Sequence, residues 1–225
     1  MASFVEGSFG SGMILFTRPD YDPVTKYISA WSKVLIRESV EKAIECIDLF
    51  DDKANKKEFE GRVLKTNPSL VVLNGHGNND CVTGQDQEPL VIKGQNTNIL
   101  ASRITYAISC DSAKGLGDEV GKYPSTAYIG YDRKFGFMYS HGFLSRPEED
   151  PLAKPFMEFS NQVVRGLIKE HTAEECIQRA KEVGEANLRK LESSLSDPDI
   201  QMAAAFLWRD INHLVVRGDE HKKIY

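Results

Sequence analysis

Short apolar runs alternate along the chain with longer amphipathic stretches. The runs that predict buried strands are residues 13–17, 46–50, 70–74, 104–109, 126–130 and 213–216. The stretches that predict helices, most with apolar residues spaced as on one helix face, are residues 24–44, 51–65, 112–120, 151–170, 172–195 and 198–212. Residues 81–84 and 89–92 predict a small surface hairpin. This order predicts an α/β fold with a doubly wound, mostly parallel sheet flanked by helices in three α/β/α layers.

Composition narrows the class of protein. The 225 residues fit a single domain, residues 1–225. The chain has 28 Lys and Arg against 33 Asp and Glu, a net charge of −5, and no long basic run, so we expect no direct binding of nucleic acid. Its apolar runs are far shorter than the ~20 residues of a membrane span, and its start lacks the basic region of a secretory signal. We therefore expect a cytoplasmic protein that does not enter a membrane.

The ends of the predicted strands carry the candidate chemistry, because ligands in such sheets bind beyond the carboxyl ends of the strands. The segments expected there are Arg18 with Asp20, residues 75–78, residues 110–112 and residues 131–133. His76 directly follows the most apolar strand, and Cys110 directly follows the next strand of the sheet. Ends of neighbouring strands bring such a pair within reach of one substrate carbonyl.

This pair of residues predicts nucleophilic catalysis. We expect a helix to begin near residue 112 and to favour the Cys110 thiolate through its dipole. The backbone N–H groups of Gly77 and Cys110 would lie free of the sheet and hold an oxyanion. The structural alternative is a buried core cysteine and a histidine in a capped turn.

No metal or other cofactor is expected. The four cysteines form no CxxC pair, and the combination of His76, Cys81 and Cys110 has no repeated ligand spacing. His141, in a long aromatic loop, is expected to be a lid or surface residue rather than a base.

Two blocks of sequence resemble the clan CD, or caspase-like, cysteine peptidases, nearest the gingipain-like and CHAT-domain branch. The blocks are Val72-Leu73-Asn74-Gly75-His76-Gly77 and Tyr106-Ala107-Ile108-Ser109-Cys110-Asp111-Ser112-Ala113. Residues 127–131 and 214–219 also resemble the strands that follow the cysteine and close the domain. The resemblance covers about residues 10–220. It implies a cysteine endopeptidase acting on protein substrates through His76 and Cys110.

The sequence also departs from better-known branches of that family. Ile108 stands two residues before the cysteine, where metacaspases have an acid, so their preference for the substrate's P1 residue cannot be transferred. The interval of 34 residues from His76 to Cys110 is shorter than the ~50 typical of caspases.

The P1 pocket is expected between the loops after the first and fifth strands. Asp20 with Asp132 would select a basic P1 residue, whereas Arg18 with Arg133 would select an acidic one. We expect a slight preference for a basic residue, through Asp132. If each Arg pairs with a nearby Asp, the pocket is apolar.

Control is expected to come from residues 131–150, a Gly- and aromatic-rich stretch that could move until cleavage or a separately encoded activator protein orders the pocket. The alternative is a packed surface segment. Two other functions also remain open: a non-enzymatic caspase-like scaffold in a prokaryotic defence or signalling complex, and a doubly wound ligand-binding domain.

Overall fold

The computed structural model describes residues 12–193 and 197–225. Its main sheet has six strands in the order β2-β1-β3-β7-β8-β9, and a second sheet has three, β4-β5-β6. The main strands are β1 (Ile14–Arg18), β2 (Cys46–Phe50), β3 (Leu70–Asn74), β7 (Ile104–Ile108), β8 (Ala127–Tyr131) and β9 (Leu214–Gly218). All neighbours in this sheet pair in parallel except β8 and β9, which are antiparallel. The expectation of a mostly parallel α/β sheet is confirmed.

The small sheet lies in the connection between β3 and β7. Its strands are β4 (Gly77–Asn78), β5 (Cys81–Thr83) and β6 (Pro89–Ile92). The hairpin predicted from β5 and β6 is therefore joined by a short strand that begins one residue after His76.

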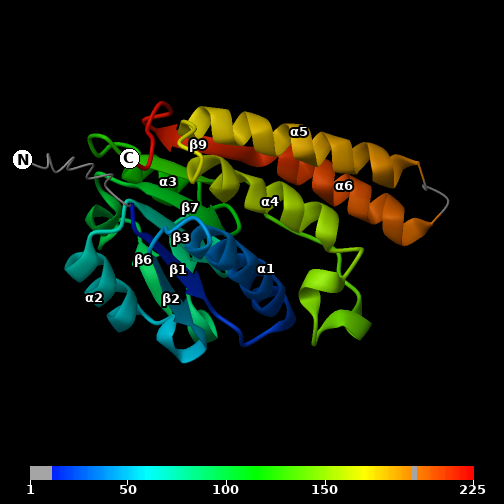
Figure 1. The fold of residues 1–225 in the computed structure, drawn as a ribbon, viewed down its shortest axis with the longest axis horizontal. Coiled ribbons are helices and arrows are strands. Elements are labelled where there is room, and N and C mark those ends of the chain that lie inside the picture. The colour runs from blue at the N-terminus through cyan, green and yellow to red at the C-terminus, as the bar shows by residue number, and fades with distance from the viewer. Residues whose placement is uncertain (1–11, 194–196) are drawn as a thin grey trace, which may run out of the picture.

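Helices cover both faces of the main sheet (Figure 1). They are α1 (Pro23–Val40), α2 (Lys56–Thr66), α3 (Gly115–Val120), α4 (Lys154–Leu167), α5 (Ala173–Glu192) and α6 (Pro198–His213). Side chains of α1, α4, α5 and α6 share one apolar core with alternate strand residues such as Phe16. Side chains of α2, α3 and the small sheet share a second core with the intervening residues, such as Leu15. Because successive strand residues point to opposite faces, the fully apolar strands read from the sequence belong to a sheet covered on both sides.

Several helix boundaries differ from the sequence expectation: the helix expected over 24–44 ends at Val40, the one expected over 151–170 spans Lys154–Leu167, and two further starts differ for local reasons. The predicted cap at residue 51 or 52 is wrong: these residues form a 3₁₀ turn, and the Asn55 side chain accepts a hydrogen bond from Glu58 N to start α2. The helix expected from residue 112 begins only at Gly115, after a turn in which Asp111 has a φ of +56°. This later start separates α3 from Cys110.

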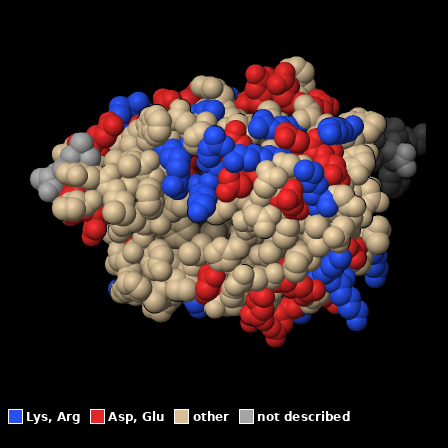
Figure 2. All heavy atoms as spheres, turned by 180° about the vertical axis from the view of Figure 1, so that it is seen from behind, with Lys and Arg blue, Asp and Glu red and all other residues tan. Residues whose placement is uncertain are grey.

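In the described part of the chain, no helix combines the length and apolar character needed to cross a bilayer. On the face drawn in Figure 2, basic side chains gather across the middle, with acidic side chains among and beside them. That face therefore presents mixed charge rather than a basic stripe of the kind that follows a phosphate backbone.

Candidate functional site

His76 and Cys110 occupy matching positions beyond two adjacent parallel strands. The register of β3 and β7 pairs Asn74 with Ile108, and each candidate residue lies two positions further along its strand. A backbone hydrogen bond of 3.3 Å from Gly75 N to Ile108 O extends this pairing past the strand ends. The two loops thus leave the sheet side by side at its carboxyl edge.

Gly77 sets how closely the two loops approach. A Cβ atom at this position would overlap the side-chain oxygen of Ser109 and lie 2.7 Å from Cys81 O. Ser109 is buried and directly precedes Cys110. The backbone of Gly77, next to His76, therefore packs against the side chain of Ser109, next to Cys110, and only glycine permits that contact.

The imidazole of His76 is held by Asp22. Its Nε2 atom lies 2.7 Å from the Asp22 Oδ2 atom, and the side chains are 40% and 29% exposed. Asp22 is the N-cap residue of α1, and its Oδ1 atom accepts a hydrogen bond of 2.8 Å from Thr25 N. One carboxylate oxygen thus caps the helix while the other orients the histidine, because the two roles use different oxygens.

Hydrogen bonds keep Asp22 ionised beside the imidazole. Burial opposes ionisation of this carboxyl, but the Thr25 backbone N–H, His76 and the Thr25 hydroxyl together lower its pKa below the ordinary value. Of the two neutral tautomers of the imidazole, a carboxylate at Nε2 favours the one whose proton lies on Nε2. The Nδ1 atom of His76 then carries the free lone pair that can accept a proton.

Cys110 is less prepared for reaction than the sequence suggested. Burial raises the pKa of its thiol, and the carboxylates of Asp111 and Asp210 add to that effect. The Sγ atom donates to Phe135 O at 3.4 Å. The expected activation by a helix dipole is not seen, because α3 begins five residues beyond the cysteine.

Both expected oxyanion donors lie outside the strand pairing of the described residues. Thr83 N donates to His76 O at 2.9 Å, so in the alternating antiparallel pattern the Gly77 N–H points away from β5. Cys110 lies two residues past the end of β7. Neither N–H is committed to holding two strands together.

The first pair of predicted pocket residues points away from the His76–Cys110 edge. The Arg18 guanidinium is buried and forms an ion pair of 2.7 Å with Asp48 on β2, with Phe50 stacked on it. Asp20 lies 3.3 Å from Lys26 of α1. Both residues line a cavity of about 280 Å³ beside α1, and that cavity is not lined by His76 or Cys110.

The second pair lies past β8, next to the strand that carries Cys110. The Asp132 carboxylate is engaged by His213 at 2.8 Å and by Arg217 at 3.7 Å. Arg133 is exposed, and its guanidinium donates to the Asp132 backbone oxygen at 3.1 Å. The expected neighbourhood of β1 and β8 on either side of β3 and β7 is confirmed, but Asp132 and Arg133 do not line the cavity that Arg18 and Asp20 line.

Residues 131–150 pack against the rest of the protein rather than extending away from it. Phe135 is buried, and its ring lies 4.7 Å from that of Tyr131. Further along, the fully buried Asp150 accepts hydrogen bonds from the Tyr27 hydroxyl at 2.6 Å and from Ser140 N at 2.7 Å. This arrangement has the features of the packed alternative. His141, at the surface of this segment, is exposed as expected.

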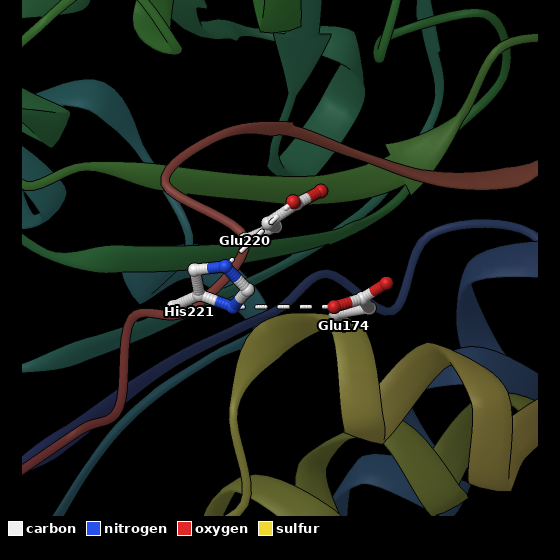
Figure 3. Close-up of side chains that lie close together, drawn as sticks. All are labelled: Glu174, Glu220 and His221. Atoms are coloured by element: carbon white, nitrogen blue, oxygen red, sulfur yellow. Dashed lines mark ion pairs between the residues drawn. The ribbon is translucent and has the colours of Figure 1, made fainter.

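Among the described residues, the side chains close enough to share a metal ion are Glu174, Glu220 and His221 (Figure 3). All three are exposed, and His221 forms ion pairs of 3.9 Å with both carboxylates. They lie at the start of α5 and after β9, whose antiparallel direction takes its end to the opposite edge of the sheet from Cys110. The combination of His76, Cys81 and Cys110 does not come together in this way.

No protein-family model matches the chain, and no curated protein is significantly similar to it. The interpretation of the site therefore depends on its geometry. Asp22 is the residue of the candidate site that sequence reasoning missed, although Asp22-Pro23 followed by Thr25 is a recognisable helix start.

Proposed function

We propose that the chain is a caspase-like cysteine endopeptidase in which Cys110 is the nucleophile and His76 the general base. The observation that carries this proposal is the orientation of the His76 imidazole. His76 lies on the loop adjacent to that of Cys110, and its Nε2 atom is held by Asp22. A surface histidine in a turn needs no such orientation. A base that must receive a thiol proton at Nδ1 does.

The reaction would proceed by acyl transfer to sulfur. Cys110 gives its proton to His76 Nδ1, and its sulfur attacks the scissile carbonyl carbon. The N–H groups of Gly77 and Cys110 stabilise the resulting oxyanion. When the carbon–nitrogen bond breaks, His76 returns the proton to the leaving amine. A water, deprotonated by His76, then hydrolyses the thioester and restores the thiol.

The substrate is proposed to be a protein, with the P1 side chain bound on the β8 side of the cysteine. Asp132 remains the candidate for a basic P1 residue, but its pairing with His213 and Arg217 weakens the field that it offers. A positional-scanning peptide library, run on the parent chain and on Asp132→Asn, measures this contribution directly. An unchanged P1 profile in the variant removes Asp132 from the pocket.

The second candidate, a scaffold module without turnover, is favoured by the raised pKa of Cys110 and by its bond to Phe135. A resting thiol of this kind also suits an enzyme that waits for a separate activator protein. A reducing cytoplasm suits all four cysteines, which are free in the structure.

An electrophilic cysteine probe, applied to the parent chain and to Cys110→Ala, separates the two candidates. A probe with a peptide recognition element and a simple alkylating agent should be compared. Preferential labelling of Cys110 by the peptide probe supports the peptidase, and equal labelling by both supports the scaffold.

A further inference from the structure

One peptide unit connects the candidate nucleophile to a buried acid. The carbonyl oxygen of Phe135 accepts the thiol proton of Cys110 at 3.4 Å. On the same peptide, the N–H of Gly136 donates to the Oδ2 atom of Asp210 at 3.4 Å. The Cys110 thiol is therefore linked to the Asp210 carboxylate through the peptide unit between Phe135 and Gly136.

Asp210 is an unusual residue for its position. It lies on the inner side of α6, 1% exposed, where an ionised group needs partners. Its Oδ1 atom accepts a hydrogen bond from Arg209 at 3.4 Å, and a Cβ atom on Gly136 would lie 2.6 Å from the same Arg209 nitrogen. The Asp210 carboxylate and the Arg209 guanidinium, at adjacent positions on the helix, thus both lie against the Gly136 backbone.

The groups around this contact come from several elements. Tyr106 on β7 and Tyr131 on β8 lie close enough to Asp210 for its charge to raise the pKa of each hydroxyl, after burial. Around the thiol, burial is the main cause of the raised pKa, and Asp111 and Asp210 add to it, while the Phe135 backbone contact and Lys134 lower the pKa. Burial also raises the pKa of Asp210 well above the ordinary value, against the opposing effect of Arg209.

We propose that the Phe135–Gly136 peptide is a latch that keeps the Cys110 thiol turned toward Phe135, and that Asp210 is the positioning residue that keeps this latch closed. The proposal rests on the proposed function in treating Cys110 as the nucleophile. A thiol that donates to Phe135 O cannot at the same time donate to His76. Opening the latch must therefore precede proton transfer.

The nearly isosteric variant Asp210→Asn tests the latch, because it removes the ionisable carboxyl group and weakens the acceptor for the Gly136 N–H. The measurement is the rate of Cys110 alkylation by iodoacetamide between pH 6 and pH 10 in the full chain. Trypsin places each of the four cysteines on a different peptide, with Cys110 on residues 104–114, so mass spectrometry follows this thiol alone. Amide hydrogen exchange at Gly136 is measured in parallel.

We expect the midpoint of the alkylation profile to fall by about one pH unit in Asp210→Asn, which gives about tenfold faster labelling at neutral pH. Exchange of the Gly136 amide should also become faster. Asp197→Asn is the matched control, because Asp197 is the N-cap residue at the other end of the same helix, where its side chain accepts a hydrogen bond from Asp199 N. Its profile and its Gly136 exchange should equal those of the parent.

An unchanged midpoint in Asp210→Asn overturns the proposal. So does a lower midpoint with unchanged Gly136 exchange, because that result means that the charge acts through space without a latch. If the variant does not fold, the parent chain still decides: exchange of the Gly136 amide as fast as in the urea-unfolded chain contradicts a closed latch. None of these readings requires turnover, so failure of the peptidase assignment is detected separately by Cys110→Ala.

Discussion

The two sides of the candidate site are prepared to different degrees. On the β3 side, His76 is 40% exposed and is already oriented by a carboxylate 2.7 Å away. On the β7 side, the Cys110 thiol is partly buried, has a raised pKa and is bonded to a backbone carbonyl. The imidazole proposed as the base is thus oriented, whereas the thiol proposed as the nucleophile is bonded elsewhere.

The difference follows from the elements that support each side. His76 is oriented from α1, whose N-cap Asp22 is fixed by the first turn of an 18-residue helix. Cys110 is contacted from residues 135–136, which lie in an irregular segment and contact Asp210 of α6. A regular helix gives one stable geometry, whereas an irregular segment can adopt a second one at lower cost. If the latch opens, we therefore expect the change of geometry on the Cys110 side of the site.

The largest expected effect on turnover comes from removing the prepared side. His76→Ala should lower kcat/KM toward a peptide substrate by about a thousandfold, because it removes the proposed general base. The thermal unfolding midpoint should stay close to that of the parent, since the ring is partly exposed. His141→Ala, which removes an exposed ring outside the site, should leave turnover unchanged. Comparable losses in both variants would show that the distinction between them is wrong.

The next effect concerns the contact between the two sides. Gly77→Ala places a methyl group against Ser109 and must move the His76 loop away from the Cys110 loop. A displacement of this size should lower kcat by about a hundredfold. Gly142→Ala is the matched control, because a Cβ atom there meets nothing within 4 Å. Equal kcat values in the two variants would contradict the need for close loops.

A smaller loss is expected when the orienting carboxylate is neutralised. Asp22→Asn can still cap α1 through its amide oxygen but no longer offers His76 a charge, so kcat should fall by about tenfold. The pH profile of kcat should change as well, which a purely structural role would not produce. Asp197→Asn changes the N-cap of α6 and serves as the control. A similar fall in kcat in that control would assign the effect to helix capping.

The smallest effect on turnover is expected at Asp150, where the change in stability is instead large. Asp150→Asn replaces an acceptor of the Tyr27 hydroxyl and of two backbone N–H groups, and should lower the free energy of unfolding by about 2 kcal/mol at pH 7. Burial opposes ionisation of Asp150, but these bonds, led by that of Ser140 N, lower its pKa in the folded protein.

The contribution of Asp150 is then complete above the ordinary carboxyl pKa of about 3.9 and is lost as the pH falls through the lower folded-state value. Urea denaturation at pH 7 and at lower pH should show the parent and the variant converging in acid. Limited proteolysis of the parent should leave residues 131–150 intact. Rapid cleavage there would restore the expectation of a mobile loop.

The helices and strands of this fold could be predicted from the sequence because each has a local pattern of apolar residues. Continuous apolar runs such as Leu70–Asn74 predict strands covered on both faces, and the structure has β3 at those residues. The antiparallel direction of β9 had no such signal, because it depends on where α6 ends relative to β8. The start of α3 was misplaced because the sequence does not reveal the positive φ of Asp111.

The site was only partly readable for the same reason. His76 and Cys110 follow strands, so their positions come from the strand pattern. Asp22 and Asp210 act from helices that are distant in sequence, and their roles depend on tertiary packing. The expected activation of the thiol was wrong in direction, because burial and neighbouring carboxylates outweigh any effect of the short α3 helix.

The most direct test of the central claim is cleavage of a quenched fluorescent peptide library by the parent chain and by Cys110→Ala, with each protein checked for folding by circular dichroism. The account predicts cleavage by the parent, covalent capture of Cys110 by a peptide-based electrophile, and no cleavage by the folded variant. Cleavage that persists in Cys110→Ala would contradict the assignment of this cysteine as the nucleophile.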